Sequence, residues 1–247
     1  MTTDGGVSAT LFVHVLHQPA PRDAWAAAMC YANAVSLTWS CRLSVAEYAA
    51  LGRRAPAPRQ NCPRCARPMA FDGCYRRCVR EAGTVHPIFV HRARCGPCGR
   101  SEALLPHFVC RRRHDSVSSI GAAVLARHGV DLDTGASGLY RGVPRRTLRS
   151  WYQRFAEHAE DLWVRLEALT IEWGGTLPFP PRYPASPSKA AIQAMGELWR
   201  AARHRWGMDI PAAWPLANLV FASGLLATRV DLPWPIRRSH IGWFAPP

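Results

Sequence analysis

The sequence has no long apolar run and no sign of an export signal. Its longest apolar stretch, residues 216–227, is interrupted by Asn218, Ser223 and Gly224 and falls short of the roughly 18 residues that a membrane span requires. No basic segment precedes the short apolar patch at residues 9–16, which argues against a secretory signal. We therefore expect a cytoplasmic protein without a membrane segment. In such a reducing compartment, closely spaced cysteines bind metals more often than they form disulfides.

Acidic residues are scarce in the middle of the chain. The segment from Arg53 to Arg154 contains 20 arginines, no lysine and six acidic residues, so it carries the whole net formal charge of +14. Lys189 is the sole lysine of the chain, and arginine-rich codon usage explains that choice of cation. Codon usage does not explain why acids are missing from one segment. A concentrated arginine excess is typical of nucleic-acid binding.

Two C-x-x-C pairs dominate the cysteine pattern, Cys62–Cys65 and Cys95–Cys98, with 29 residues between them. Two residues between cysteines let both sulfurs face one ion, and two such pairs form a closed tetrahedral site typical of structural zinc. The sequence therefore predicts one structural Zn²⁺ ion with these four ligands. A redox pair would be expected singly at a helix start, and catalytic zinc would need an open coordination position.

The residues between the two pairs predict a β-hairpin. Its expected arms are residues 70–80 and 84–94, with the turn at residues 81–83, and Pro87 favours a sheet edge for the second arm. Further metal-binding side chains lie in or near this region and could compete as ligands, although ordinary strand or loop positions are the commoner outcome. They are Cys74, Cys78, His107 and Cys110.

Helical patterns follow the cysteine pairs. Ser116 is a candidate N-cap and Gly129 a candidate stop for one helix, and Pro144 opens a second that extends to Trp173. Shorter helices are expected at 44–52, 188–206 and 212–227. We therefore expect a mainly α protein with a small β zinc ribbon, followed by a helix-turn-helix and a C-terminal helical region. The expected divisions are an N-terminal segment and linker (1–61), the zinc ribbon (62–110), the helix-turn-helix region (111–176), a Pro-rich linker (177–187) and a C-terminal helical region with a Trp- and Pro-rich tail (188–247).

The helix-turn-helix prediction rests on the segment from Gly142 to Trp151. Leu148, Trp151 and Phe155 share a face that would pack on the core, and the opposite face is basic and polar. Such a face could enter a major groove, or it could be the solvated side of an ordinary amphipathic helix. Together with arginines in and after the hairpin, the candidate nucleic-acid contacts are Arg92, Arg94, Arg111, Arg112, Arg113, Arg145, Arg146, Arg149, Ser150 and Gln153.

Several motifs together resemble a known group of proteins. They are Cys62-Pro-Arg-Cys65, Gly73-x-Tyr75-x-Arg77, Arg92-x-Arg94-Cys95-x-x-Cys98, Leu104-Leu-Pro106, Gly142-Val-Pro144, Thr147-Leu-Arg-x-Trp151, Trp199-Arg-Ala-Ala-Arg203 and Leu225-Leu-Ala-Thr228. Over about residues 40–236 the chain is similar to actinobacterial proteins of unknown function, encoded near mobile elements, that join a zinc ribbon to a transposase-like helix-turn-helix. Ser137, Gly138 and Arg141 depart from that pattern, which predicts a short or distorted first helix of the motif.

These observations predict a zinc-containing protein that binds double-stranded DNA. The resemblance implies an accessory or regulatory role in a transposon or other mobile element, with a transposase or its ATPase as a candidate partner. We expect a nucleoid-associated protein of the cytoplasm that is not an enzyme. An RNA- or protein-binding zinc-ribbon adaptor is the main alternative, and a metal-dependent nuclease is the third.

Overall fold

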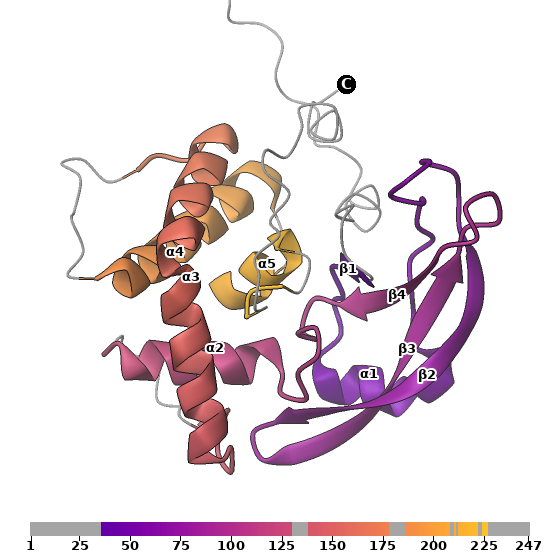
Figure 1. Ribbon diagram of the computed structural model, residues 1–247, viewed down its shortest axis with the longest axis horizontal. Coiled ribbons are helices and arrows are strands. Elements are labelled where there is room, and N and C mark those ends of the chain that lie inside the picture. Colours follow the sequence, from indigo (N-terminus) through magenta and orange to yellow (C-terminus); the bar gives the residue numbers. More distant parts are fainter. Residues whose placement is uncertain are drawn as a thin grey trace, which may run out of the picture.

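The computed structural model describes residues 36–129, 138–177, 186–207, 210, 212–221 and 224–226. These residues form a sheet beside a body of helices (Figure 1). In chain order the elements are β1 (Ser36–Trp39), α1 (Val45–Leu51), the 3₁₀ turn η2 (Gly52–Arg54), β2 (Ala70–Glu81), β3 (Thr84–Arg94), β4 (Ser101–Pro106), α2 (Val117–Arg127), α3 (Arg145–Glu172), α4 (Pro187–Trp206) and α5 (Ala213–Val220). Most of the expected Pro-rich linker and the C-terminal tail lie outside the described residues.

The sheet has four strands in the order β1-β4-β3-β2. β2 and β3 form the expected antiparallel hairpin, β4 pairs antiparallel with β3, and β1 lies parallel to β4. The hairpin turns at Ala82 and Gly83, whose φ values of 50° and 79° match a two-residue turn of the kind that follows the right-handed twist of the strands. The sequence pattern thus predicted both arms of the hairpin.

The expectation of a mainly α fold with a small ribbon is wrong. The hairpin belongs to a mixed sheet, and the strands precede most of the helices. The sequence did not predict β1, because its four residues are too few for their alternation of polar and apolar types to stand out, and burial of all four hides which face is solvated. Its partner is also distant, since Leu37 pairs with Leu104. A parallel pairing across such a separation leaves no local signal in the sequence.

The segment before the first cysteine pair packs on this sheet. Ser44 and Glu47 form a capping box that starts α1, which confirms the short helix expected there. The Tyr48 hydroxyl donates a hydrogen bond of 3.2 Å to the Phe89 carbonyl, and the His91 ring lies 2.9 Å from the Ala55 carbonyl. Within the segment between α1 and Cys62, Ala55 is buried in the sheet's core.

Pro87 lies in a part of β3 that has a single neighbouring strand. β4 pairs with β3 over His91–Arg94 alone, so β3 is an inner strand at that end. At Pro87 the register pairs β3 with β2 and with no other strand. The proline therefore lies where a missing N–H leaves no ladder bond unmade, although the edge strands of the sheet as a whole are β1 and β2.

The helical body has its own core. The Ser116 side chain caps α2, and α3 and α4 pack side by side (Figure 1). Trp151 and Phe155 are fully buried and Leu148 is partly buried against the same core, as the helical pattern predicted. None of the described helices is long and apolar enough to cross a bilayer.

The structure also corrects the helix-turn-helix prediction. α2 ends at Arg127 and α3 begins at Arg145, so 17 residues separate them, whereas a helix-turn-helix uses a turn of three or four. Of the residues that directly precede α3, 138–143 are described, and they form turns rather than a helix. Glycine at position 142 has φ of 76° there. The fold after β4 is therefore a helical body without that motif in its described residues.

Candidate metal centre and the arginine surface

The two cysteine pairs adopt the same loop conformation. In each loop the N–H of the first cysteine donates a hydrogen bond of 2.8 Å to the carbonyl five residues later. The pairs are Cys62 with Arg67 and Cys95 with Arg100. The residue after each second cysteine has positive φ, 58° at Ala66 and 64° at Gly99. Each loop therefore curls back on itself and points both of its sulfurs to the same side.

The structure brings the four predicted cysteines together. Their sulfurs all lie within 4.8 Å of one another, and the Sγ atoms of Cys65 and Cys95 are 3.4 Å apart. A tetrahedral zinc ion with bonds of about 2.3 Å requires sulfur separations of about 3.8 Å. Cys62 and Cys95 are buried and the other two are half-buried. The cluster therefore has the donors, spacing and enclosure of a structural metal site.

The thiols of this cluster influence one another's ionisation. Hydrogen bonds from the Arg67 backbone and from neighbouring thiols lower the pKa of Cys65 to about 7. The interaction with Cys65, together with burial, raises the pKa of Cys98 to about 12. Four thiolates at this spacing would repel one another, and a bound cation is what would keep them all ionised.

The other candidate ligands do not assemble into a site. Among the described residues the four-cysteine cluster is the one group of three or more potential ligands. Cys74 and Cys78 lie on β2, and burial in the helical core raises the pKa of Cys110 to about 11. His107 is buried, which lowers its pKa to about 4, and its Nδ1 accepts a hydrogen bond of 3.1 Å from the Cys41 N–H. None of these four side chains therefore joins a metal-binding group among the described residues.

The arginine-rich segment presents most of its charge to solvent. Fourteen of its 20 arginines are exposed. Two of its acids are buried in ion pairs, Asp115 with Arg80 at 2.7 Å and Glu102 with Arg100. These acids neutralise charge inside the molecule rather than on its surface. Each pair removes one acid and one arginine, so the net positive charge of the segment remains on its other arginines.

Most of the candidate nucleic-acid contacts are accessible. The exposed ones are Arg92, Arg94, Arg112, Arg145, Arg146, Arg149 and Gln153. Arg111 is half-buried, and the Ser150 hydroxyl accepts a bond from Arg154. Arg113 differs, because its guanidinium donates 3.1 Å to the Leu226 carbonyl and so joins two parts of the backbone.

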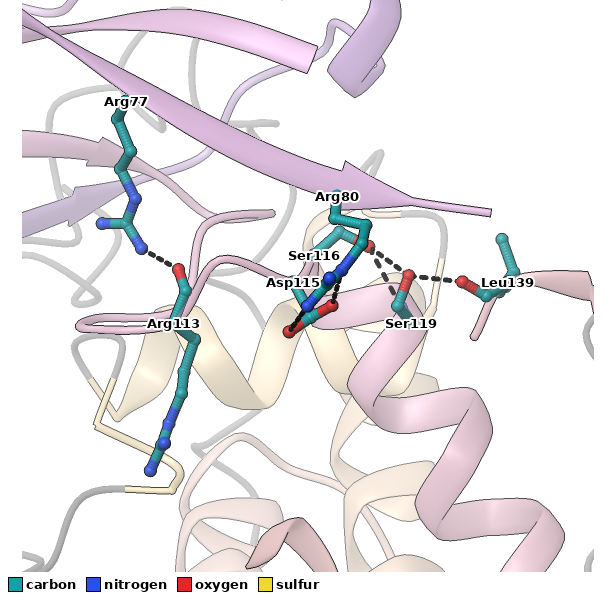
Figure 2. Close-up of polar contacts among 7 residues, drawn as sticks. All are labelled: Arg77, Arg80, Arg113, Asp115, Ser116, Ser119 and Leu139. Atoms are coloured by element: carbon teal, nitrogen blue, oxygen red, sulfur yellow. Dashed lines mark hydrogen bonds and ion pairs between the residues drawn. The ribbon is translucent and has the colours of Figure 1, made fainter. Parts of the chain in front are cut away.

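Sequence reasoning missed two arginines that connect the sheet to the helical body. Arg77 donates to the carbonyls of Cys110 and Arg113, and burial lowers the pKa of its guanidinium. Arg80 forms the ion pair with Asp115, and Figure 2 shows both arginines reaching from β2 toward the segment before α2. Nothing in their spacing distinguishes them from the exposed arginines, since their role depends on a partner segment more than 30 residues away.

Residues 62–151 match the model of a family described as a domain of unknown function, DUF6431. The match begins at Cys62, the first of the four clustered cysteines, and ends at Trp151, in the second turn of α3. It therefore covers both cysteine loops, the hairpin, β4, α2 and the beginning of α3 as one unit. Neither a curated protein nor a solved structure matches the chain.

Proposed function

We propose that this protein binds double-stranded DNA and that its four cysteines hold one structural zinc ion. The observation that carries the proposal is the unbalanced surface charge of the arginine-rich segment, where Asp72 is the one exposed acid among the described residues and 14 arginines are exposed. Arginine presents a rigid fork of donors that suits phosphate oxygens. A surface of this kind attracts a phosphate backbone whatever its base sequence.

Zinc is the metal that this donor set favours. Four thiolates at tetrahedral spacing suit a borderline-soft ion and leave no coordination position for water or substrate. The ion would therefore hold the two loops together rather than perform chemistry. Its binding would order the end of the hairpin that carries Arg92 and Arg94.

The first turn of α3 supports a phosphate-binding role. Arg145 and Arg146 are exposed there, and Arg149 is exposed in the next turn. The first turn contains no acid, and Pro144 supplies no side-chain cap. Positive charges at the positive end of a helix dipole disfavour folding, and an anion placed there is favourable. A bound phosphate backbone would therefore offset the unfavourable interaction of these arginines with the helix dipole.

A second candidate function has its own observation. Phe71 and Tyr75, both on β2, are 54% and 40% exposed. Exposed aromatic rings between arginines can stack on unpaired bases, so the hairpin could bind single-stranded RNA or DNA. Duplex and single-stranded probes in competition separate the two candidates. Phe71→Leu should weaken binding if stacking matters, and it should leave duplex binding unchanged if the backbone is the target.

The role that we propose for such a DNA-binding protein is accessory or regulatory rather than enzymatic. It rests on the similarity of the cysteine, arginine and Gly142-Val-Pro144 motifs to proteins encoded near mobile elements. A transposase or its ATPase is the candidate protein partner. Co-purification of either with the full chain, resistant to nuclease treatment, is the measurement that tests this part.

The salt dependence of binding tests the main proposal. With about five phosphate contacts, the slope of log K against log salt for a duplex should lie near −4 to −5, because each contact releases a counterion. Arg146→Gln should reduce that slope by about one. The matched control is Arg205→Gln, an exposed arginine of α4 outside the arginine-rich segment, which should leave the slope unchanged. A nearly flat dependence in the wild type would exclude a nucleic acid as the partner.

A further inference from the structure

The tip of the hairpin is joined to the helical body by a closed ring of polar contacts. We call it the junction ring, and its members are Arg80, Ala82, Asp115, Ser116, Ser119 and Leu139. Figure 2 shows all of them except Ala82. On one side the Arg80 guanidinium binds both carboxylate oxygens of Asp115, at 2.7 and 3.2 Å. The Arg80 carbonyl also accepts 2.9 Å from the Ser116 N–H. The hairpin is thereby attached to the start of α2.

The ring closes at the carbonyl of Leu139. The Ser116 hydroxyl donates a hydrogen bond of 3.0 Å to the Ser119 hydroxyl. The Ser119 hydroxyl in turn donates one of 2.7 Å to the Leu139 carbonyl. The same carbonyl accepts 2.9 Å from the Ala82 N–H at the hairpin turn. Three elements distant in sequence thus meet at one backbone oxygen. Asp115, Ser116 and Ser119 are each at most 4% exposed, so these bonds are shielded from water.

The ring holds the loop that leads into α3. Leu139 lies six residues before the first residue of α3, and a side chain placed on Gly83 would come within 3.7 Å of the Arg141 carbonyl. The hairpin tip and α2 both hydrogen-bond to this segment at Leu139. It is followed directly by three exposed arginines, Arg141, Arg145 and Arg146. At its other end the same hairpin leads to the four cysteines.

We infer that the junction ring positions the arginines of the loop and first turn of α3 against those of the hairpin, so that both groups bind one duplex as a single surface. Ser119 is the key positioning residue, although it would touch no nucleic acid. This inference rests on the proposed DNA binding. The physical reason is preorganisation, because a loop that is already ordered loses little entropy when it binds.

Ser119 offers a selective way to test the ring. The cap of α2 is the Ser116 hydroxyl, which accepts 3.1 Å from the Ser119 N–H, so Ser119→Ala keeps the cap and removes the bond to Leu139. We expect duplex affinity to fall about fivefold or more, with the zinc content unchanged. Ser118→Ala, at the neighbouring and less buried position of α2, is the control and should bind like the wild type.

Double-mutant cycles distinguish positioning from general damage. Ser119→Ala and Arg146→Gln should be non-additive, because a misplaced Arg146 has less binding left to lose. Ser119→Ala and Arg94→Gln should be additive, because Arg94 lies at the cysteine end of β3. Amide hydrogen exchange should also speed up at residues 139–145 in Ser119→Ala and stay unchanged in the cysteine loops.

The outcomes separate the two levels of the proposal. If the wild type binds a duplex but Ser119→Ala has no effect, or is additive with Arg146→Gln, the positioning role is overturned and DNA binding stands. If the wild type binds no duplex at low salt, the proposed function itself fails. Should Ser119→Ala lower the melting temperature markedly, Asp115→Asn replaces it in the same cycles, because it keeps the side-chain shape and weakens only the ion pair with Arg80.

Discussion

The sheet and the helical body are stabilised by different means. The sheet's core is built around Leu37, Tyr48 and Leu104, and at one end it reaches the buried Cys62 and Cys95. The helical core is larger and consists of apolar and aromatic side chains from α2 to α5, without a metal-binding cluster in its described residues. The difference teaches that the cysteine cluster and apolar burial lie in separate regions, so that a metal held by the cluster would stabilise the sheet independently of the helical core. A change that removes one should leave the other measurable.

Loss of the metal should have the largest effect, and it should be confined to the sheet. Cys95→Ser removes one of the four proposed ligands. The metal would then be lost, and with it a contribution on the order of 10 kcal/mol to the folding of the cysteine loops. We expect the purified wild type to carry one zinc per chain and the variant almost none. Hydrogen exchange should rise in β2 and β3 while the helical core stays protected.

The control for this experiment is Cys78→Ser, an exposed cysteine outside the cluster, which should keep its full metal content. Full metal retention in Cys95→Ser would show that the ligand set is wrong. Equal loss of protection in α3 and α4 would break the comparison, and would mean that the junction makes the two regions one cooperative unit.

His107 should make stability depend on pH at the boundary of the two regions. Its backbone N–H donates a hydrogen bond to the Trp39 carbonyl of the sheet, and its backbone carbonyl accepts one of 2.8 Å from the Asn218 side chain of α5. Burial lowers its pKa from 6.5 to about 4, so the folded state favours the neutral ring. The resulting stability is full above pH 6.5 and is lost as the pH falls toward 4, by about 3 kcal/mol in all.

Denaturant unfolding of the wild type and His107→Asn between pH 7 and 4 measures this term. Asparagine can still accept a bond from the Cys41 N–H but does not titrate, so the variant should lose less stability on acidification. The comparison between the two proteins also removes the effect of acid on the metal site, which they share. Parallel curves for both would show that His107 does not titrate in this range.

The smallest effects concern the packing of single glycines in the helical body. A Cβ on Gly121 would lie 2.5 Å from the Trp214 ring, so Gly121→Ala should destabilise the protein by about 1–3 kcal/mol without loss of metal. Gly196 of α4 is the matched control, because its nearest neighbour is the tip of Arg200 at 4.0 Å. Gly196→Ala should raise stability by about 0.5–1 kcal/mol. Thermal unfolding with metal analysis checks both, and equal responses would contradict this packing of α2 on α5.

Local patterns predicted local features well. The hairpin, the start of α2 at Ser116 and the extent of α3 all follow from alternation, capping and helical periodicity, which involve residues close in sequence. The clustering of the four cysteines followed from their spacing for the same reason. β1 and the 17-residue separation of α2 from α3 did not, because the first is a fully buried parallel strand and the second depends on how the loop is anchored.

The sequence by itself determined which four cysteines would meet, the hairpin and the excess of arginine, because each depends on residue type and short spacing. Only the tertiary structure decided which arginines are free to meet a partner and which hold the molecule together. Arg77, Arg80 and Arg113 carry the same charge as their exposed neighbours, yet carbonyls and a carboxylate from distant segments bind them. A guanidinium's role depends on what the fold places within hydrogen-bond distance, and in this protein those partners come from the other side of the junction.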